Sequence, residues 1–269
     1  MPLALEAVPG LDDADLERRF AGLRRLYGAQ GYARLRAATV AVVGLGGVGS
    51  WAVEALARCG VAGLVLIDLD HVAESNVHRQ VQATSRTLGQ SKVQALRERI
   101  HDIHPGCQVQ GVEAFVEPGN WPALLPRPVH GLIDACDQVC AKVALAQWAR
   151  EQALPFVCVG AAGGKRQPQR VEVADLAETT HDPLLASLRQ RLRKQAGAPR
   201  QGRMGLCCVF SREAVMLPAA EGAVDGSLNC AGYGSSVSVT ATFGMVAAAQ
   251  AIEQLLALPA GQEVAAGPL

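Results

Sequence analysis

The sequence contains few aromatic residues and has no excess of charge of either sign. Only 4% of its 269 residues are Phe, Trp or Tyr, and 25 basic residues balance 25 acidic ones. A protein that binds nucleic acid over a large surface usually carries a strong positive charge, so that class is disfavoured and any contact with nucleic acid must be local. The hydrophobic content of 49% supports a sizeable core and excludes a disordered chain.

The sequence also lacks any C-x-x-C pair, although it contains eight cysteines. Such pairs are the usual sign of a structural zinc site, so nothing in the sequence indicates one. The first ten residues have neither a basic start nor an apolar core, which argues against a signal peptide. We therefore expect a protein of the reducing cytoplasm, in which most cysteines belong to the core.

One apolar stretch, residues 235–260, is long enough to suggest a membrane span. Its polar residues, together with Glu253, weaken this interpretation. We expect instead a buried C-terminal helix that packs on a sheet, and no stable membrane insertion.

Residues 39–70 have the pattern of a nucleotide-binding unit of strand, turn, helix and strand. The first strand is predicted at residues 40–43 and the second at residues 64–67, and Asp68 follows directly. Between the strands lie the glycines Gly44, Gly46, Gly47 and Gly49. Glycines at this spacing let the backbone approach a phosphate at a helix N-terminus, and the acid can bind ribose hydroxyls. The pattern predicts an adenine-nucleotide pocket, which dinucleotide oxidoreductases and ATP-using adenylating enzymes share.

The order of the predicted elements indicates an α/β fold with a doubly wound, Rossmann-like and mainly parallel sheet. Apolar β-branched runs alternate with helical patterns, as expected for parallel strands covered on both faces. The predicted strands are 40–43, 64–67, 131–133 and 156–159, and the predicted helices include 92–104 and 139–152. After residue 164 we expect a short strand at 170–173 and a helix that begins at Asp182-Pro183. We predict a single adenylating domain over residues 1–269, with a nucleotide-binding core at about 38–165 and a C-terminal elaboration at about 166–269.

Polar residues beyond the glycine turn indicate the chemistry of the pocket. Asp70, Asn76, Arg79 and Lys92 follow the second strand, and Asp137 follows a later one. Because ligands of open α/β sheets bind at the carboxyl ends of the strands, these residues are expected to gather there. A hydride-transfer enzyme has no need for Arg79 and Lys92 beside a second acid. An enzyme in which an oxygen nucleophile attacks the α-phosphate of ATP needs such residues, because the cations offset phosphate charge and Asp137 can hold Mg²⁺.

This ordered set resembles the ubiquitin-activating-like, or ThiF/MoeB-like, family of adenylating enzymes over residues 18–165. The resemblance implies that ATP and Mg²⁺ bind. It assigns phosphate binding to Gly44, Gly46, Gly47 and Gly49, ribose binding to Asp68, triphosphate contacts to Asn76, Arg79 and Lys92, and Mg²⁺ to Asp137, with Asp70 as a further candidate near the metal. In these dimers an arginine from the N-terminal helix of one subunit reaches the ATP of the other, and Arg19 resembles it. The resemblance thus implies a homodimer with composite sites, whose catalytic residues are Arg19, Arg79, Lys92 and Asp137.

Further segments resemble the branch of that family that dehydrates threonylcarbamoyladenosine in tRNA. They are residues 19–28, 160–164, 182–184, 208–211 and 229–234. The resemblance implies that ATP activates the threonine carboxylate, next to the anticodon, as an acyl-adenylate, and that an internal nitrogen or oxygen of the carbamoyl group then closes the ring. Cysteine desulfurases and sulfur-acceptor proteins are associated with this branch as partners, although no residue here marks such a contact.

The segment from Pro183 to Arg212 contains seven cations and no acid. It predicts either a solvated helix face with a loop or a local surface for tRNA phosphates. Cys208 lies where thioester-forming relatives carry a nucleophile. Ring closure needs no thioester, so we expect mainly a buried strand cysteine there.

Two other functions remain open from the sequence. The first is an adenylyltransferase that activates the C-terminal glycine of a small sulfur-carrier protein, although such enzymes usually carry a zinc on two C-x-x-C pairs. The second is an NAD-binding redox sensor or scaffold that uses only the glycine turn and Asp68, which leaves Arg79, Lys92 and Asp137 unexplained. A titration of NAD against ATP would separate the second function from the adenylating enzymes.

Overall fold

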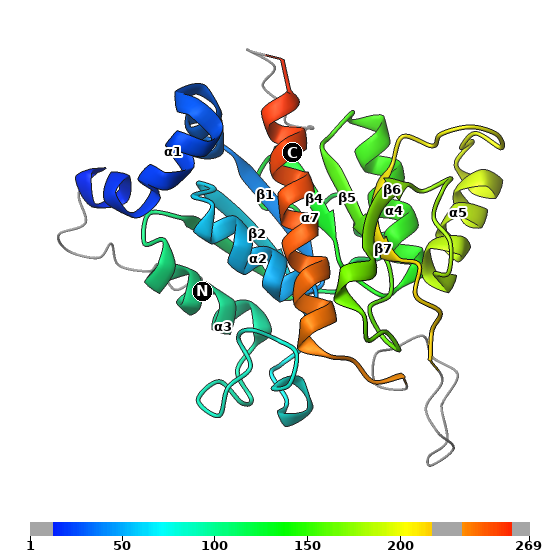
Figure 1. Cartoon of the computed structure of the whole chain (residues 1–269), viewed down its shortest axis with the longest axis horizontal. Coiled ribbons are helices and arrows are strands. Elements are labelled where there is room, and N and C mark those ends of the chain that lie inside the picture. Colours follow the sequence, from blue (N-terminus) through cyan, green and yellow to red (C-terminus); the bar gives the residue numbers. More distant parts are fainter. Residues whose placement is uncertain (1–12, 217–232, 260–269) are drawn as a thin grey trace.

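The computed structural model describes residues 13–216 and 233–259, and a seven-stranded sheet with helices on both faces forms its centre (Figure 1). The strands are β1 Thr39–Val43, β2 Gly63–Ile67, β3 Gln108–Val112, β4 Gly131–Asp134, β5 Phe156–Val159, β6 Val171–Asp175 and β7 Cys207–Ser211. They lie in the order β3-β2-β1-β4-β5-β7-β6, and only the pairing of β6 with β7 is antiparallel among these described strands. The predicted α/β fold with a mainly parallel sheet is confirmed.

The helices cover both faces of this sheet. They are α1 Asp13–Leu35, which is kinked at Gly28, α2 Gly49–Arg58, α3 Lys92–Ile103, α4 Val139–Glu151, α5 Pro183–Gln195 and α7 Val237–Ala257, with short 3₁₀ turns η1 Glu74–Asn76 and η2 Pro168–Arg170. Side chains of α1, α2, α3 and α7 share one hydrophobic cluster with Val40 and Val42 of β1. Those of α4 and α5 share the other with Ala41 and Val43. Since both faces are covered, the central strands are continuous apolar runs.

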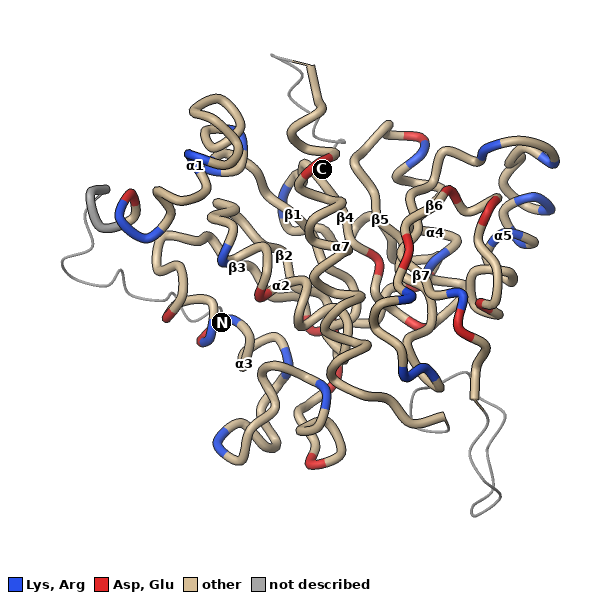
Figure 2. Tube along the Cα trace, in the orientation of Figure 1, with Lys and Arg blue, Asp and Glu red and all other residues tan. Residues whose placement is uncertain are grey.

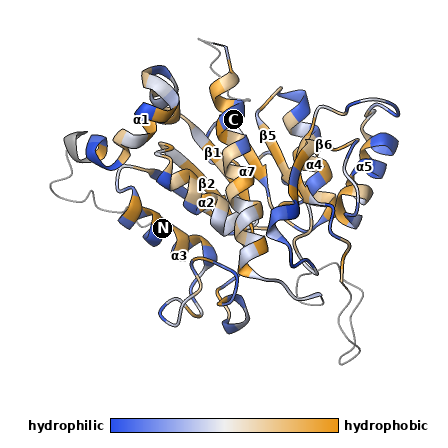
Figure 3. Ribbon diagram, viewed as in Figure 1, coloured by the Kyte–Doolittle hydropathy of each residue, from blue (hydrophilic) through white to orange (hydrophobic). Residues whose placement is uncertain are grey.

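Helix α7 contains most of the apolar stretch near the C-terminus. By length and composition it could cross a membrane, but half of its apolar window is buried within the protein. Val239, Phe243 and Ala247 are fully buried, and a Cβ added to Gly244 would lie 2.7 Å from Cβ of Trp51, so α7 crosses α2 closely. Figure 3 shows this helix lying across the sheet. Its buried hydrophobic residues belong to the hydrophobic cluster that also includes residues of α2 and β1. The expected packing of a C-terminal helix on the sheet is confirmed.

The sheet changes its direction of growth between β1 and β4. From β1 the chain adds β2 and then β3 on one side, and it returns to place β4 on the other. In open α/β sheets, ligands bind at the carboxyl ends of the strands at such a switch point. A Cβ added to Gly44, directly after β1, would lie 2.8 Å from the backbone of Ala135 and Cys136, directly after β4. The fold thus brings the glycine turn against the loop that carries Asp137.

Candidate active site

The glycine turn between β1 and α2 is shaped for a close approach to a ligand. Gly44 has a φ of +85°, which a residue with a side chain rarely adopts. A Cβ added to Gly49 would overlap the carbonyl oxygen of Gly44, whereas Gly46 has open space around it. Helix α2 begins here without a side-chain cap at Val48 and without an acid in its first turn. The positive end of the α2 dipole therefore favours an anion here.

Asp68 joins the end of β2 to this turn. Its Oδ2 accepts a hydrogen bond of 2.6 Å from Leu45 N, and its Oδ1 accepts one of 2.8 Å from Asp70 N. Burial raises the pKa of Asp68 above its usual value, although the Lys92 ammonium and the two amides act against this rise. Ribose hydroxyls are donors that would stabilise such a partly desolvated carboxylate.

Lys92 lies at the first position of α3, beside the two acids that follow β2. Its Nζ is 2.6 Å from Asp70 Oδ2 and 3.9 Å from Asp68 Oδ1. The Lys92 side chain is only 7% exposed, but that of Asp70 is 54% exposed. Asp70 is thus a solvent-facing counter-ion, and a phosphate could replace it at little cost.

Arg79 and Asn76 come from the segment around η1. The side chain of Arg79 lies over the glycine turn, since a Cβ added to Gly47 would meet its Cγ and Cδ at 3.3 Å. Its Nη1 donates to Ser75 O at 2.6 Å. Asn76 is buried, and its Oδ1 accepts from Ala73 N at 3.1 Å, which closes the 3₁₀ turn. In this structure Asn76 therefore shapes the segment that carries Arg79 to the glycine turn.

The acid that ends β4 and the acid that follows it have different surroundings. Asp134 is completely buried in an ion pair with Lys142, whereas Asp137, three residues later, is exposed. Among the residues that the structure describes, no group of three or more His, Cys, Asp or Glu side chains could hold a metal ion. Mg²⁺ commonly binds to one or two carboxylates together with substrate phosphates and water. Asp137 fits that mode, since its loop contacts the glycine turn.

Arg19 lies away from the other candidate residues within one chain. Its Nη1 donates to Asp102 O at 3.3 Å and to Ile103 O at 3.0 Å, at the C-terminal end of α3. Lys92 begins the same helix, about 17 Å away by the usual rise of 1.5 Å per residue. A single chain therefore gathers the glycine turn, Asp68, Asp70, Asn76, Arg79, Lys92 and Asp137, and it leaves Arg19 outside.

Two buried lysines near this edge of the sheet were missed by the sequence analysis. Lys142 is in the first turn of α4. Lys165 donates to Ser211 O, at the end of β7, and to Glu213 O, two residues later, each at 3.0 Å. A signal for Lys142 was present, because it precedes Leu145, Ala146 and Ala149 on the apolar face of a predicted helix. A lysine at such a position indicates a buried partner of opposite charge.

Cys208 is fully buried on β7, between β5 and β6. It pairs in register with Cys158, which pairs with Asp134. A nucleophile must reach its substrate, so this position supports the expectation of a buried strand cysteine.

Comparisons with known proteins agree with this geometry. The model of the ThiF family matches residues 17–266. The chain is 41% identical over 257 residues to the tRNA threonylcarbamoyladenosine dehydratase of Escherichia coli (strain K12), which covers 91% of this chain and 96% of that protein. The crystal structure of the E. coli enzyme TcdA in complex with ATP superposes with a TM-score of 0.83 at 40% identity, over 91% of this chain and 96% of that one.

A relative of the sulfur-carrier type is less similar. The adenylyltransferase and sulfurtransferase MOCS3 of Drosophila willistoni is 33% identical over 119 residues, which are 44% of this chain and 26% of that protein. The family match, by contrast, includes the nucleotide-binding unit, the loop after β4 and α7. From the glycine turn at the switch point and from a family match over nearly its whole length, we conclude that this chain belongs to the ThiF family.

Proposed function

We propose that this protein dehydrates threonylcarbamoyladenosine in tRNA, next to the anticodon, to its cyclic form, with ATP as co-substrate. The observation that carries the proposal is that Arg79, Lys92 and the solvent-facing Asp70 lie beside the glycine turn, near the β1/β4 switch point. The 41% identity to a tRNA threonylcarbamoyladenosine dehydratase supports the choice of substrate. A cytoplasmic location follows from the substrate.

The reaction begins with adenylation. A carboxylate oxygen of the threonine moiety attacks the α-phosphorus of ATP, the bond to the β-phosphate oxygen breaks, and pyrophosphate leaves. An internal nitrogen or oxygen of the carbamoyl group then attacks the acyl carbon, loses its proton, and releases AMP. Because the second nucleophile belongs to the same molecule, its effective concentration is high and no thioester is required. The net change in the nucleoside is the loss of one water.

The residues of the site have separate roles in this proposal. Amides of the glycine turn and of the α2 N-terminus hold the phosphates, and Asp68 orients the ribose. Lys92 leaves Asp70 for the triphosphate and, with Arg79, stabilises the charge that develops on it. Asp137 would hold Mg²⁺, which would supply further charge stabilisation to the pyrophosphate leaving group.

We further propose a homodimer in which Arg19 completes the site of the partner. This is supported by its position on α1, outside its own chain's site, where exposed hydrogen bonds to two carbonyls of α3 hold it only weakly. Arg19→Ala subunits mixed with Lys92→Ala subunits should then recover up to a quarter of the sites as intact ones on random mixing. Recovery no greater than the sum of the two separate variants would contradict a shared site.

The basic segment provides a candidate surface for tRNA. A hollow of about 510 Å³ beside α5 is lined by Arg189, Arg193, Lys194 and Arg200, and by no acid. Figure 2 shows basic residues gathered along α5 and the connection that follows it. Arg189 is already bonded to Leu176 O and Thr179 O, so Lys194 and Arg200, both exposed, are the cations best placed for phosphates.

The proposal is tested by incubation of the protein with ATP, Mg²⁺ and tRNA that bears threonylcarbamoyladenosine, followed by digestion and mass spectrometry of the nucleosides. An ATP-dependent loss of one water is expected. An unchanged nucleoside, with AMP formed only when small carrier proteins are added, would instead favour the sulfur-carrier adenylyltransferase. Tight binding of NAD without binding of ATP would favour the redox sensor.

A further inference from the structure

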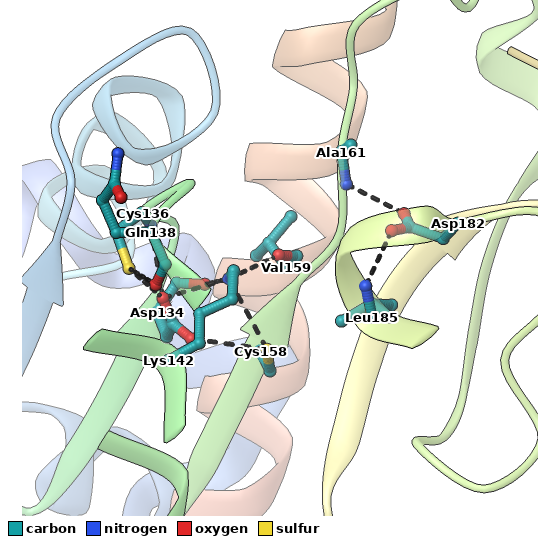
Figure 4. Close-up of polar contacts among 9 residues, drawn as sticks. All are labelled: Asp134, Cys136, Gln138, Lys142, Cys158, Val159, Ala161, Asp182 and Leu185. Carbon is teal, nitrogen blue, oxygen red and sulfur yellow. Dashed lines mark hydrogen bonds and ion pairs between the residues drawn. The ribbon is translucent and has the colours of Figure 1, made fainter. Parts of the chain in front are cut away.

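A buried lysine–aspartate pair, drawn in Figure 4, closes the base of the turn that carries Asp137. Lys142 Nζ lies 3.1 Å from Asp134 Oδ1, and neither side chain has exposed surface. Asp134 is the last residue of β4, and Lys142 is in the first turn of α4. The pair therefore joins the two ends of a strand–turn–helix segment whose middle is Asp137.

The polar atoms around this pair are all engaged. Lys142 Nζ donates to Val159 O at 2.7 Å and lies 3.6 Å from Cys158 Sγ, and that thiol is 3.4 Å from Asp134 Oδ2. Burial alone would lower the pKa of Lys142, but the adjacent Asp134 carboxylate raises that pKa above its usual value, so the ammonium stays charged. A buried network in which every member has a partner is rigid.

The same carboxylate shapes the turn. Asp134 Oδ1 accepts hydrogen bonds from Cys136 N at 3.2 Å and from Cys136 Sγ at 2.9 Å. The backbone of Ala135 and Cys136 is the wall against which Gly44 packs. Lys142 fixes Asp134, and Asp134 fixes the amide of Cys136, the residue before Asp137. The pair is therefore linked both to the glycine turn and to the exposed acid.

Stability alone does not explain why this pair is ionic. Replacing a buried ion pair by apolar side chains of similar size is often neutral or stabilising, because two charges no longer have to be desolvated. Leu145, Ala146 and Ala149, on the same buried side of α4, are apolar. What an apolar pair could not supply is the acceptor for Cys136 N.

We propose that Lys142 is a positioning residue, which orients Asp134 so that the turn presents Asp137 to Mg²⁺-bound ATP. The proposal rests on the proposed function only in assigning Mg²⁺ to Asp137. Lys142 touches neither nucleotide nor metal in this role. It acts through Asp134 and the backbone of the turn, as the outer partners of metal ligands commonly do.

The test compares the Kd of ATP in EDTA with the Kd in excess Mg²⁺, by calorimetry; their ratio is the magnesium gain. We expect Lys142→Met to lower the magnesium gain about 10–100-fold, as is usual for outer partners of metal ligands. Asp137→Asn serves as the reference for complete loss. Leu145→Ala, a cavity variant on the same helix that removes no hydrogen bond or ion pair described for Asp134, should lose stability yet keep the magnesium gain of the wild type.

A second variant separates positioning from folding. Asp134→Leu/Lys142→Met removes both charges and should fold, but it lacks the acceptor for Cys136 N and should also lose the magnesium gain. If this stable double variant keeps the wild-type gain, or if Lys142→Met behaves as Leu145→Ala does, the inference is wrong. A wild type without any gain would overturn it together with the Mg²⁺ assignment. Conversion of tRNA by the wild type, measured separately, tests the proposed function independently.

Discussion

Two lysine–aspartate pairs lie near the carboxyl edge of the same sheet, and their surroundings give them opposite properties. Lys142 and Asp134 have no exposed surface and share their remaining hydrogen bonds with the ends of β4 and β5. Lys92 pairs with Asp70, whose side chain is 54% exposed. The first ammonium cannot change its partner without leaving a buried charge, whereas the second can exchange a hydrated carboxylate for a phosphate. One pair fixes the shape of the site, and the other is available for chemistry.

The largest expected effect is on folding, from the buried pair. Lys142→Met should lower the free energy of unfolding by about 3–5 kcal/mol, because it leaves Asp134 buried without its cation. Urea unfolding followed by circular dichroism measures this loss. Recovery of most of it in Asp134→Leu/Lys142→Met would confirm that the unpaired charge is the cause, and a double variant as unstable as the single one would contradict it.

The second effect is on catalysis, from the exchangeable pair. Lys92→Met should slow ATP-dependent ring closure by about 10²–10³-fold, the usual loss when one group that stabilises developing charge is removed. Single-turnover formation of AMP measures the rate. The urea midpoint should fall much less than in Lys142→Met. If it falls equally, the two pairs do not differ as described.

A smaller effect concerns the pH dependence of the free energy of unfolding. His104 is buried beside Arg36, and burial together with Arg36 and Arg19 lowers its pKa to about 4. Unfolding returns this imidazole to a pKa near 6.5, so the unfolded chain binds more protons between those values and stability falls as pH falls through this window. Urea midpoints at pH 7 and pH 5 should differ by less in His104→Gln. An unchanged difference would show that other groups cause the acid sensitivity.

The smallest effect is on the affinity for ATP and concerns Asp70. The direction of this effect decides whether Asp70 is a counter-ion or a metal ligand. Asp70→Asn removes the partner that competes with phosphate for Lys92, so ATP should bind more tightly by up to about 1 kcal/mol, the usual limit for an exposed pair. Calorimetry in Mg²⁺ measures this Kd, and Glu74→Gln, an exposed acid nearby, is the control. Weaker ATP binding in Asp70→Asn would instead place Asp70 at the metal.

The strands at the centre of the fold could be predicted because their apolar runs are continuous and the glycine turn marks the end of β1. Strand β3 was missed, since Gln108 and Gln110 interrupt its pattern and it lies at the edge of the sheet. The assignment of a single domain with a boundary near residue 165 stays a prediction. The 208–211 segment that resembles the dehydratases became part of β7, while Asn229 to Gly232 lie outside the described residues.

The parts of the candidate site that a sequence motif specifies could be predicted. The parts that depend on which side chains are buried could not. The glycines, Asp68, Arg79, Lys92 and Asp137 follow one another at family spacing, so the sequence locates them. The opposite surroundings of Asp134 and Asp137, three residues apart, depend on Lys142 and on the end of β5, which no local pattern connects. The sequence alone could not distinguish Arg189 from Lys194 as a candidate phosphate contact. Among the contacts described for these two residues, tertiary hydrogen bonds engage only the guanidinium of Arg189.

We propose that the protein dehydrates threonylcarbamoyladenosine by adenylating its carboxylate at the β1/β4 switch point. The most direct test uses tRNA in which the threonine carboxylate of this nucleoside carries oxygen-18, with ATP, Mg²⁺ and the wild-type protein. We predict formation of the cyclic nucleoside with one labelled oxygen in the phosphate of AMP, because the attacking oxygen leaves with AMP when the ring closes. Unlabelled AMP, label in inorganic phosphate with ADP as the other product, or no cyclic nucleoside would contradict the account.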